Sequence, residues 1–108
     1  ISGGWHERFG LAADPRNTGF GHDPSDVSAV RANGETLQGY YDAVYSRSLE
    51  LLNSLNPEEL DREINEPQYE PLPTVGTRLV SIVNDNTQHV GQAAYLKGLG
   101  QGISWGHD

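Results

Sequence analysis

The sequence predicts an all-α protein built around two long helices. Apolar residues recur at three- and four-residue steps over residues 36–55 and again over residues 74–98, which is the spacing of one face of an α-helix. Two long helices cannot enclose a core by themselves, whereas four can. We therefore expect a four-helix bundle, completed either by helices that precede Ile1 or by a second copy of the chain.

Length and composition narrow the classes of function. The 108 residues suit a single helical domain, residues 1–108. A net charge of −8 argues against nucleic acid and against an anionic membrane surface as partners, and no apolar run approaches the length of a transmembrane span. A cytoplasmic location is expected. The chain has no cysteine, which excludes a disulfide framework, a thiolate nucleophile and a cysteine zinc site. It begins with Ile1 and contains no methionine, so we expect a fragment, a processed product or an engineered piece.

The first part of the chain, residues 1–35, predicts an irregular loop region rich in glycine and proline. Ser25 is expected to cap one or two helical turns within it. The long helix over residues 36–55 follows. Its apolar stripe comprises Leu37, Tyr41, Val44, Tyr45, Ser48, Leu51, Leu52 and Leu55.

The second half begins with a strong capping signal. Asn56 precedes Pro57, and Glu59 stands three residues after the cap, which predicts a short helix over residues 57–62. Residues 63–73 contain three prolines and predict an extended connection. Thr74 is the expected N-cap of the helix over residues 74–98, and Gly98 is its expected stop, followed by a tail over residues 99–108.

Asp85 and His89 are the residues best placed for chemistry. They are four positions apart on the last helix, so their side chains are neighbours. A carboxylate and an imidazole at this spacing can bind one divalent metal ion, or form a pair that poises the histidine as a base. The structural alternatives are a helix-stabilising ion pair and a core histidine bonded to a neighbouring helix. Spacing alone favours these alternatives, because such pairs are common on helices.

The residues around this pair are unusually polar for a core helix. Asn86 and His89 lie on its apolar stripe, whose other members are Val75, Leu79, Ile82, Ala93 and Leu96. Burying polar side chains there is unfavourable unless they have hydrogen-bond partners. A metal ion, a bound ligand, water or another helix would supply them.

Three segments carry a resemblance to a known family. Residues 83–98, with the stretch His89-Val90-Gly91-Gln92, resemble the last helix of the bacterial DinB family, which typically reads His-x-x-x-His-x-Gly-Gln. Thr74-Val75-Gly76 resembles the opening of that helix, and Asn56–Arg62 resembles the hairpin before it. The likeness covers roughly residues 36–100, with the three segments in the same order and spacing.

The resemblance implies a four-helix bundle that holds a divalent metal through three histidines. His89 matches the last ligand, and Asp85 occupies the position of the middle one, where aspartate replaces histidine. Carboxylate oxygen still suits Zn or Ni, the metals expected first, and Mn or Fe. We expect the remaining ligand to lie before Ile1, since His6 does not match its position. Asn86 and Gln92 are expected to hydrogen-bond to the ligands and orient them.

Two functions remain open at this point. Some members of the family are thiol-dependent transferases or isomerases that use low-molecular-weight thiols, and the resemblance implies that kind of enzyme with a small-molecule ligand. The alternative is a non-catalytic helical interaction or dimerisation module in which Asp85 and His89 form a structural pair. A homodimer is expected in either case, because two copies can rebuild a four-helix bundle. Catalytic residues remain unassigned.

Overall fold

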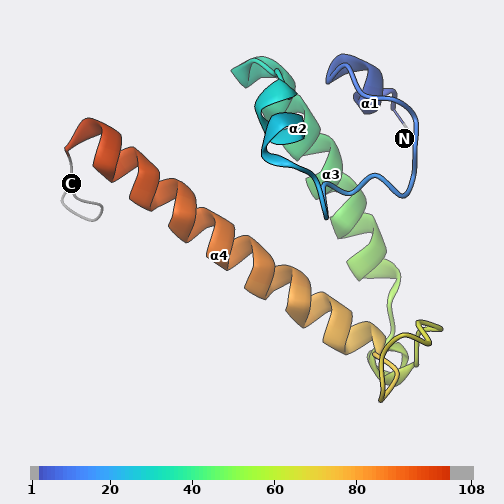
Figure 1. Ribbon diagram of the computed structural model, residues 1–108. Coiled ribbons are helices and arrows are strands. Elements are labelled where there is room, and N and C mark those ends of the chain that lie inside the picture. The colour runs from blue at the N-terminus through green and yellow to red at the C-terminus, as the bar shows by residue number, and fades with distance from the viewer. Residues whose placement is uncertain (1–2, 103–108) are drawn as a thin grey trace. The chain divides into compact units, whose positions relative to one another are not determined.

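The computed structural model describes residues 3–102, and most of these residues are helical. Within them, β-pairing is limited to one isolated antiparallel bridge between Glu63 and Thr74. The all-α prediction is confirmed for this part of the chain. The helices in chain order are α1 (Trp5–Arg8), α2 (Pro24–Ala29), α3 (Gly34–Ser54), the 3-10 helix η1 (Pro57–Asp61) and α4 (Val75–Gln101) (Figure 1).

The chain divides into two compact units, Ile1–Ser54 and Leu55–Asp108. The first unit contains α1, α2 and α3, and the second contains η1 and α4. Each unit is described by itself below. The prediction that residues 1–108 form a single domain stays a prediction.

The predicted loop region at the start of the chain contains two short helices. α2 begins one residue before the expected cap: its N-cap is Asp23 and not Ser25. The backbone N–H of Asp23 donates to Asp26 Oδ2 at 3.1 Å, and Pro24 occupies the first helical position, where its missing N–H costs nothing. Asp23 fits this role better than Ser25 because the proline must follow the cap directly.

Helix α3 begins two residues earlier than the sequence predicted. Asn33 Oδ1 accepts a hydrogen bond from the backbone N–H of Thr36 at 2.8 Å, which satisfies one of the free donors of the first turn. On the polar face, Gln38 Nε2 donates to Asp42 Oδ1 at 3.0 Å. On the apolar stripe, the rings of Tyr41 and Tyr45 stack with centroids 6.1 Å apart.

A cluster of aromatic rings joins α1 to α3. The Tyr40 ring lies 5.6 Å from the Trp5 ring and 5.5 Å from the Phe9 ring, centroid to centroid. Gly39 makes this contact possible: a Cβ atom at this position would lie 2.9 Å from Cη2 of Trp5. The glycine that weakens the helix by about 1 kcal/mol relative to alanine thus admits the tryptophan that packs on it.

The short helix of the second unit is capped as the sequence predicted. The backbone N–H of Asn56 donates to Glu59 Oε2 at 2.7 Å, and Pro57 is the first helical residue. The helix is of the 3-10 type and ends at Asp61, one residue before the predicted end. It packs on the start of α4, where a Cβ atom at Gly76 would lie 3.1 Å from the carbonyl oxygen of Leu60.

The connection over residues 63–73 folds back instead of running extended. The backbone N–H of Ile64 donates to the carbonyl of Pro73 at 2.8 Å. Arg78 of α4 then holds the loop, since its Nε donates to Glu66 Oε2 at 2.7 Å and its guanidinium lies over the Tyr69 ring. The hydrogen bond to Glu66 raises the pKa of Arg78 above its ordinary value. The prolines of residues 63–73 do not predict that the loop folds back, because its closure depends on the contact between Glu66 and Arg78, twelve residues apart.

Helix α4 is one unbroken helix that begins at its predicted cap. Thr74 Oγ1 accepts a hydrogen bond from the backbone N–H of Thr77 at 3.1 Å. The predicted stop at Gly98 is wrong, because the helix continues to Gln101 and ends at Gly102, whose φ of 66° is the left-handed conformation that favours glycine. The predicted tail therefore begins inside α4, and from residue 103 it lies outside the described residues.

Apolar side chains of both long helices are exposed. Among the described residues none of the hydrophobic side chains is buried, and Val83, Val90 and Leu96 of α4 are each about two thirds exposed (66%, 66% and 65%). None of the described helices combines the length and the apolar character needed to cross a membrane. Many residues of the apolar stripes are thus exposed among the described residues, whereas Val75 and Leu79 at the start of α4 are half-buried.

The cap of α4 gives a first prediction. Thr74→Ala removes the hydroxyl that accepts the Thr77 N–H, so it should lower the free energy of unfolding by about 1 kcal/mol. Urea unfolding followed by circular dichroism measures this change. Thr74→Ser keeps the hydroxyl and should retain most of the stability; equal losses in both variants would show that the hydroxyl does not cap the helix.

Candidate metal site on α4

Asp85 and His89 lie next to each other on α4, one turn apart. Asp85 Oδ1 is 3.6 Å from His89 Nε2, and the two side chains are 72% and 67% exposed, respectively. The helix places the two groups together as the spacing predicted. The expected burial of His89 on a core face is not found in this chain, because η1 and the folded loop pack only near the start of α4.

Gln92 fixes the orientation of the histidine ring. Its Oε1 lies 3.0 Å from His89 Nδ1, and an amide oxygen only accepts, so Nδ1 carries the proton and donates it. In the neutral imidazole, Nε2 then carries a lone pair, and this is the nitrogen that faces Asp85. Metal-binding histidines are commonly held this way, with the other ring nitrogen donating to an oxygen.

The separation of the two groups suits a shared divalent ion. Two ligand atoms that each lie about 2.0–2.15 Å from one tetrahedral metal ion are about 3.3–3.5 Å apart. The observed 3.6 Å between Asp85 Oδ1 and His89 Nε2 is close to that value. A small rotation of either exposed side chain closes the difference, so the donor pair fits two positions of a metal coordination sphere.

The other polar residues of this turn contribute less than expected. Asn86, which we predicted to orient the ligands, makes no hydrogen bond to either of them within the described residues. The hydroxyl of Thr87 donates to the carbonyl of Val83 at 2.7 Å and is therefore engaged by its own helix. Gln92 is thus the only member of the predicted supporting pair that contacts a candidate ligand in the described part of α4.

A third ligand is not found among residues 3–102. These residues contain no group of three or more His, Asp or Glu side chains arranged to hold a metal ion. His6 and His22 belong to the first unit, where His22 Nε2 donates to Asn17 Oδ1 at 2.8 Å. The pair on α4 offers two candidate ligands, and the described part of the chain places no third beside them.

Two residues beside the pair escaped the sequence analysis. Gln88 and Tyr95 line a shallow hollow on α4 together with Gln92, and Gly91 leaves open space between them. Positions 88, 92 and 95 are spaced by four and three residues, so they share one face of the helix. That periodicity was present in the sequence, but a polar–aromatic face is also typical of an ordinary solvent-exposed surface.

Taken together, the described residues form a helical protein whose last long helix carries an exposed histidine–carboxylate pair. Comparison with protein families agrees: residues 3–93 match the model of the DinB superfamily. The match covers most of the chain, so the chain belongs to this superfamily, as the resemblance predicted. The comparison with curated proteins gives no match.

The hydrogen bond from His89 to Gln92 predicts a spectroscopic signature. Where histidines are neutral, His89 should be protonated on Nδ1, and Gln92→Ala should shift the proton toward Nε2, where the Asp85 carboxylate favours it. Long-range nitrogen–proton correlation spectra of the imidazole distinguish the two tautomers. Gln88→Ala is the matched control and should leave the His89 signals unchanged. An Nε2 proton in the unmodified chain would contradict the assignment.

Proposed function

We propose that this DinB-superfamily protein binds a divalent metal ion through Asp85 Oδ1 and His89 Nε2. The observation that carries the proposal is that both nitrogens of the His89 ring have an oxygen neighbour. Gln92 occupies Nδ1 at 3.0 Å, and the remaining nitrogen faces a carboxylate oxygen at 3.6 Å. A simple helix-stabilising ion pair needs only the second of these contacts, whereas a ligand histidine uses both.

The donor set favours particular metals. One imidazole nitrogen and one carboxylate oxygen suit Zn²⁺ and Ni²⁺, with Mn²⁺ and Fe²⁺ as weaker candidates by the usual order of affinities. The chain has no cysteine, so soft thiolate coordination by the protein is excluded. Two protein ligands leave the other coordination positions to a third ligand and to exogenous molecules.

We further propose a thiol-dependent reaction at this pair. A metal ion at this pair would supply the positive charge that lowers the pKa of a coordinated thiol. Since the chain has no thiol of its own, that group would come from a low-molecular-weight thiol cofactor, as in a thiol-dependent transferase or isomerase. Asp85 and His89 would hold the ion, and the hollow lined by Gln88 and Tyr95 would contact the small molecule.

Metal titration tests the proposal. Calorimetric titration of the purified chain with zinc or nickel chloride should show a site that His89→Ala abolishes. Asp85→Asn, which keeps the shape of the side chain, should weaken binding, and Gln92→Ala should weaken it about tenfold by releasing the ring.

A histidine of the first unit provides the matched control. His22→Ala removes an imidazole that donates to Asn17 in an exposed loop, so it should leave metal affinity unchanged. If His89→Ala binds the metal as tightly as the unmodified chain, or if His22→Ala loses as much affinity, the site on α4 is refuted.

The uncovered apolar faces favour a second candidate function, a helical dimerisation module. On α3, Leu37, Tyr41 and Leu52 of the apolar stripe are 54%, 61% and 50% exposed. Apolar surface of this extent is unfavourable in water, and a second copy of the chain can bury it by packing the same stripe against itself. In this function Asp85 and His89 form a structural pair, and a homodimer is also compatible with metal binding.

Sedimentation velocity tests the dimer. At micromolar concentration the chain should sediment as a dimer, and Leu52→Lys on the apolar stripe should convert it to a monomer, because a buried unpaired charge is unfavourable. Asn53→Lys adds the same charge at the neighbouring exposed position and should leave the dimer intact. A monomeric unmodified chain would refute the dimer.

A further inference from the structure

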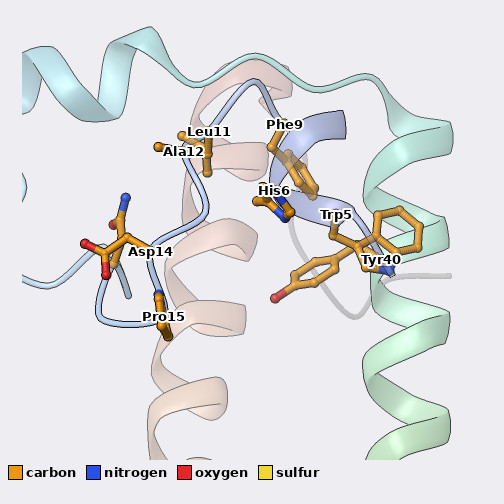
Figure 2. Close-up of a pocket in the computed structure, with 9 residues that line it drawn as sticks. Trp5, His6, Phe9, Leu11, Ala12, Asp14, Pro15 and Tyr40 are labelled. Atoms are coloured by element: carbon orange, nitrogen blue, oxygen red, sulfur yellow. The ribbon is translucent and has the colours of Figure 1, made fainter. Parts of the chain in front are cut away.

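The first unit contains a cavity that neither the metal pair nor the apolar stripes explain. It has a volume of about 370 Å³ and lies between α1, the loop that follows it and Tyr40 of α3 (Figure 2). This volume falls within the range of about 300–1,000 Å³ that small-molecule sites occupy. All of its lining residues belong to the first unit, so the cavity does not depend on α4.

The walls of the cavity are aromatic and held in place. Trp5, Phe9 and Tyr40 contribute three rings whose tilted and edge-on contacts fix their mutual orientation. Gly39 lets the Trp5 ring sit against α3, as described above. Trp5 already accepts one cation, since the guanidinium of Arg8 lies 4.2 Å from its ring centroid. The electron-rich faces of such rings favour positively charged groups, whereas their edges carry partial positive charge.

The charge of the residues that line the cavity also favours a positively charged ligand. Asp14 is the one carboxylate that lines the cavity, and the lining includes neither lysine nor arginine. Asp14 Oδ1 accepts the backbone N–H of Arg16 at 2.9 Å and lies 3.6 Å from Nε of the Arg16 side chain, which is 92% exposed, and among the described residues no hydrogen bond engages Oδ2. Oδ2 therefore remains available to a ligand. An anionic ligand would be repelled by this carboxylate, whose charge the exposed Arg16 side chain offsets only in part.

Two polar groups of the lining residues lack a hydrogen-bond partner among the described residues. Nδ1 of His6 is buried without one, and the Tyr40 hydroxyl, which points toward the loop of Asp14 and Pro15 (Figure 2), also makes none. His6 Nε2 lies 3.9 Å from Glu7 Oε1, which favours a proton on that nitrogen and leaves Nδ1 as an acceptor. His6 Nδ1 in this tautomer and the Tyr40 oxygen can each accept a hydrogen bond from a ligand, and the Tyr40 hydroxyl can also donate one.

We propose that this cavity binds a small organic cation, a protonated amine with an aromatic or apolar body. The body would pack against Trp5, Phe9 and Tyr40, while the ammonium group donates to Asp14 Oδ2 and the Tyr40 hydroxyl. The net charge of −8 favours the approach of such a ligand. The site is independent of metal binding at Asp85 and His89.

A set of three probes of similar shape tests the charge preference. Phenethylamine, phenethyl alcohol and hydrocinnamate share a phenylethyl group. Its end carries an ammonium cation, a neutral hydroxyl and a carboxylate anion, respectively. Calorimetric titration of the full chain, with a chelator present to exclude metal effects, should show binding of the amine, weaker binding of the alcohol and the weakest binding of the carboxylate. Equal affinity for the amine and the carboxylate would overturn the proposal.

Two variants test the residues. Asp14→Asn keeps the acceptor for the Arg16 N–H but removes the charge, so it should weaken amine binding about fivefold. Tyr40→Phe keeps the ring and removes a hydroxyl that makes no internal hydrogen bond, so it should fold normally and bind the amine less tightly. Asp42→Asn, which removes a carboxylate of α3 outside the cavity, is the control. Undiminished binding in both cavity variants, or an equal loss in the control, would refute the site.

Discussion

The continuous hydrogen-bonded register of α4 places the candidate metal site. Asp85, His89 and Gln92 are spaced by four and three residues, and only an unbroken helix sets these side chains beside one another. The Thr74 cap starts this helix, and the ion pair between Arg78 and Glu66 ties its first turns to the preceding loop. Gly91 and Gly98 weaken the helix locally but do not break it. The geometry of the pair therefore depends on local helical structure more than on tertiary packing.

This dependence explains what the sequence could predict. The two long helices, the caps at Asn56 and Thr74, and the proximity of Asp85 and His89 all follow from interactions between residues at most four positions apart. The end of α4 was predicted three residues too early because several glycines compete to end it, and position 102 is the one where the backbone turns left-handed. In α4 the local signals thus fixed the start of the helix more sharply than its end.

Features that depend on distant contacts were not predicted. The loop over residues 63–73 closes through Arg78. The cavity of the first unit forms because Trp5 contacts Gly39 and Tyr40, which lie 34 and 35 positions later in the sequence. The exposure of the apolar stripes is also informative. Ile82 and Leu52 lie on the predicted apolar stripes, yet among the described residues they are 56% and 50% exposed.

The central claim is that a divalent ion binds at Asp85 and His89 and not at the many other carboxylates of this acidic chain. Paramagnetic broadening by substoichiometric Mn²⁺ in amide proton–nitrogen spectra of the intact chain tests it directly. The account predicts that broadening is centred on the turn from Asp85 to His89 and fades along α4 in both directions. Broadening centred on the carboxylates of Glu58 and Glu59, or spread evenly over the acidic residues, would contradict it.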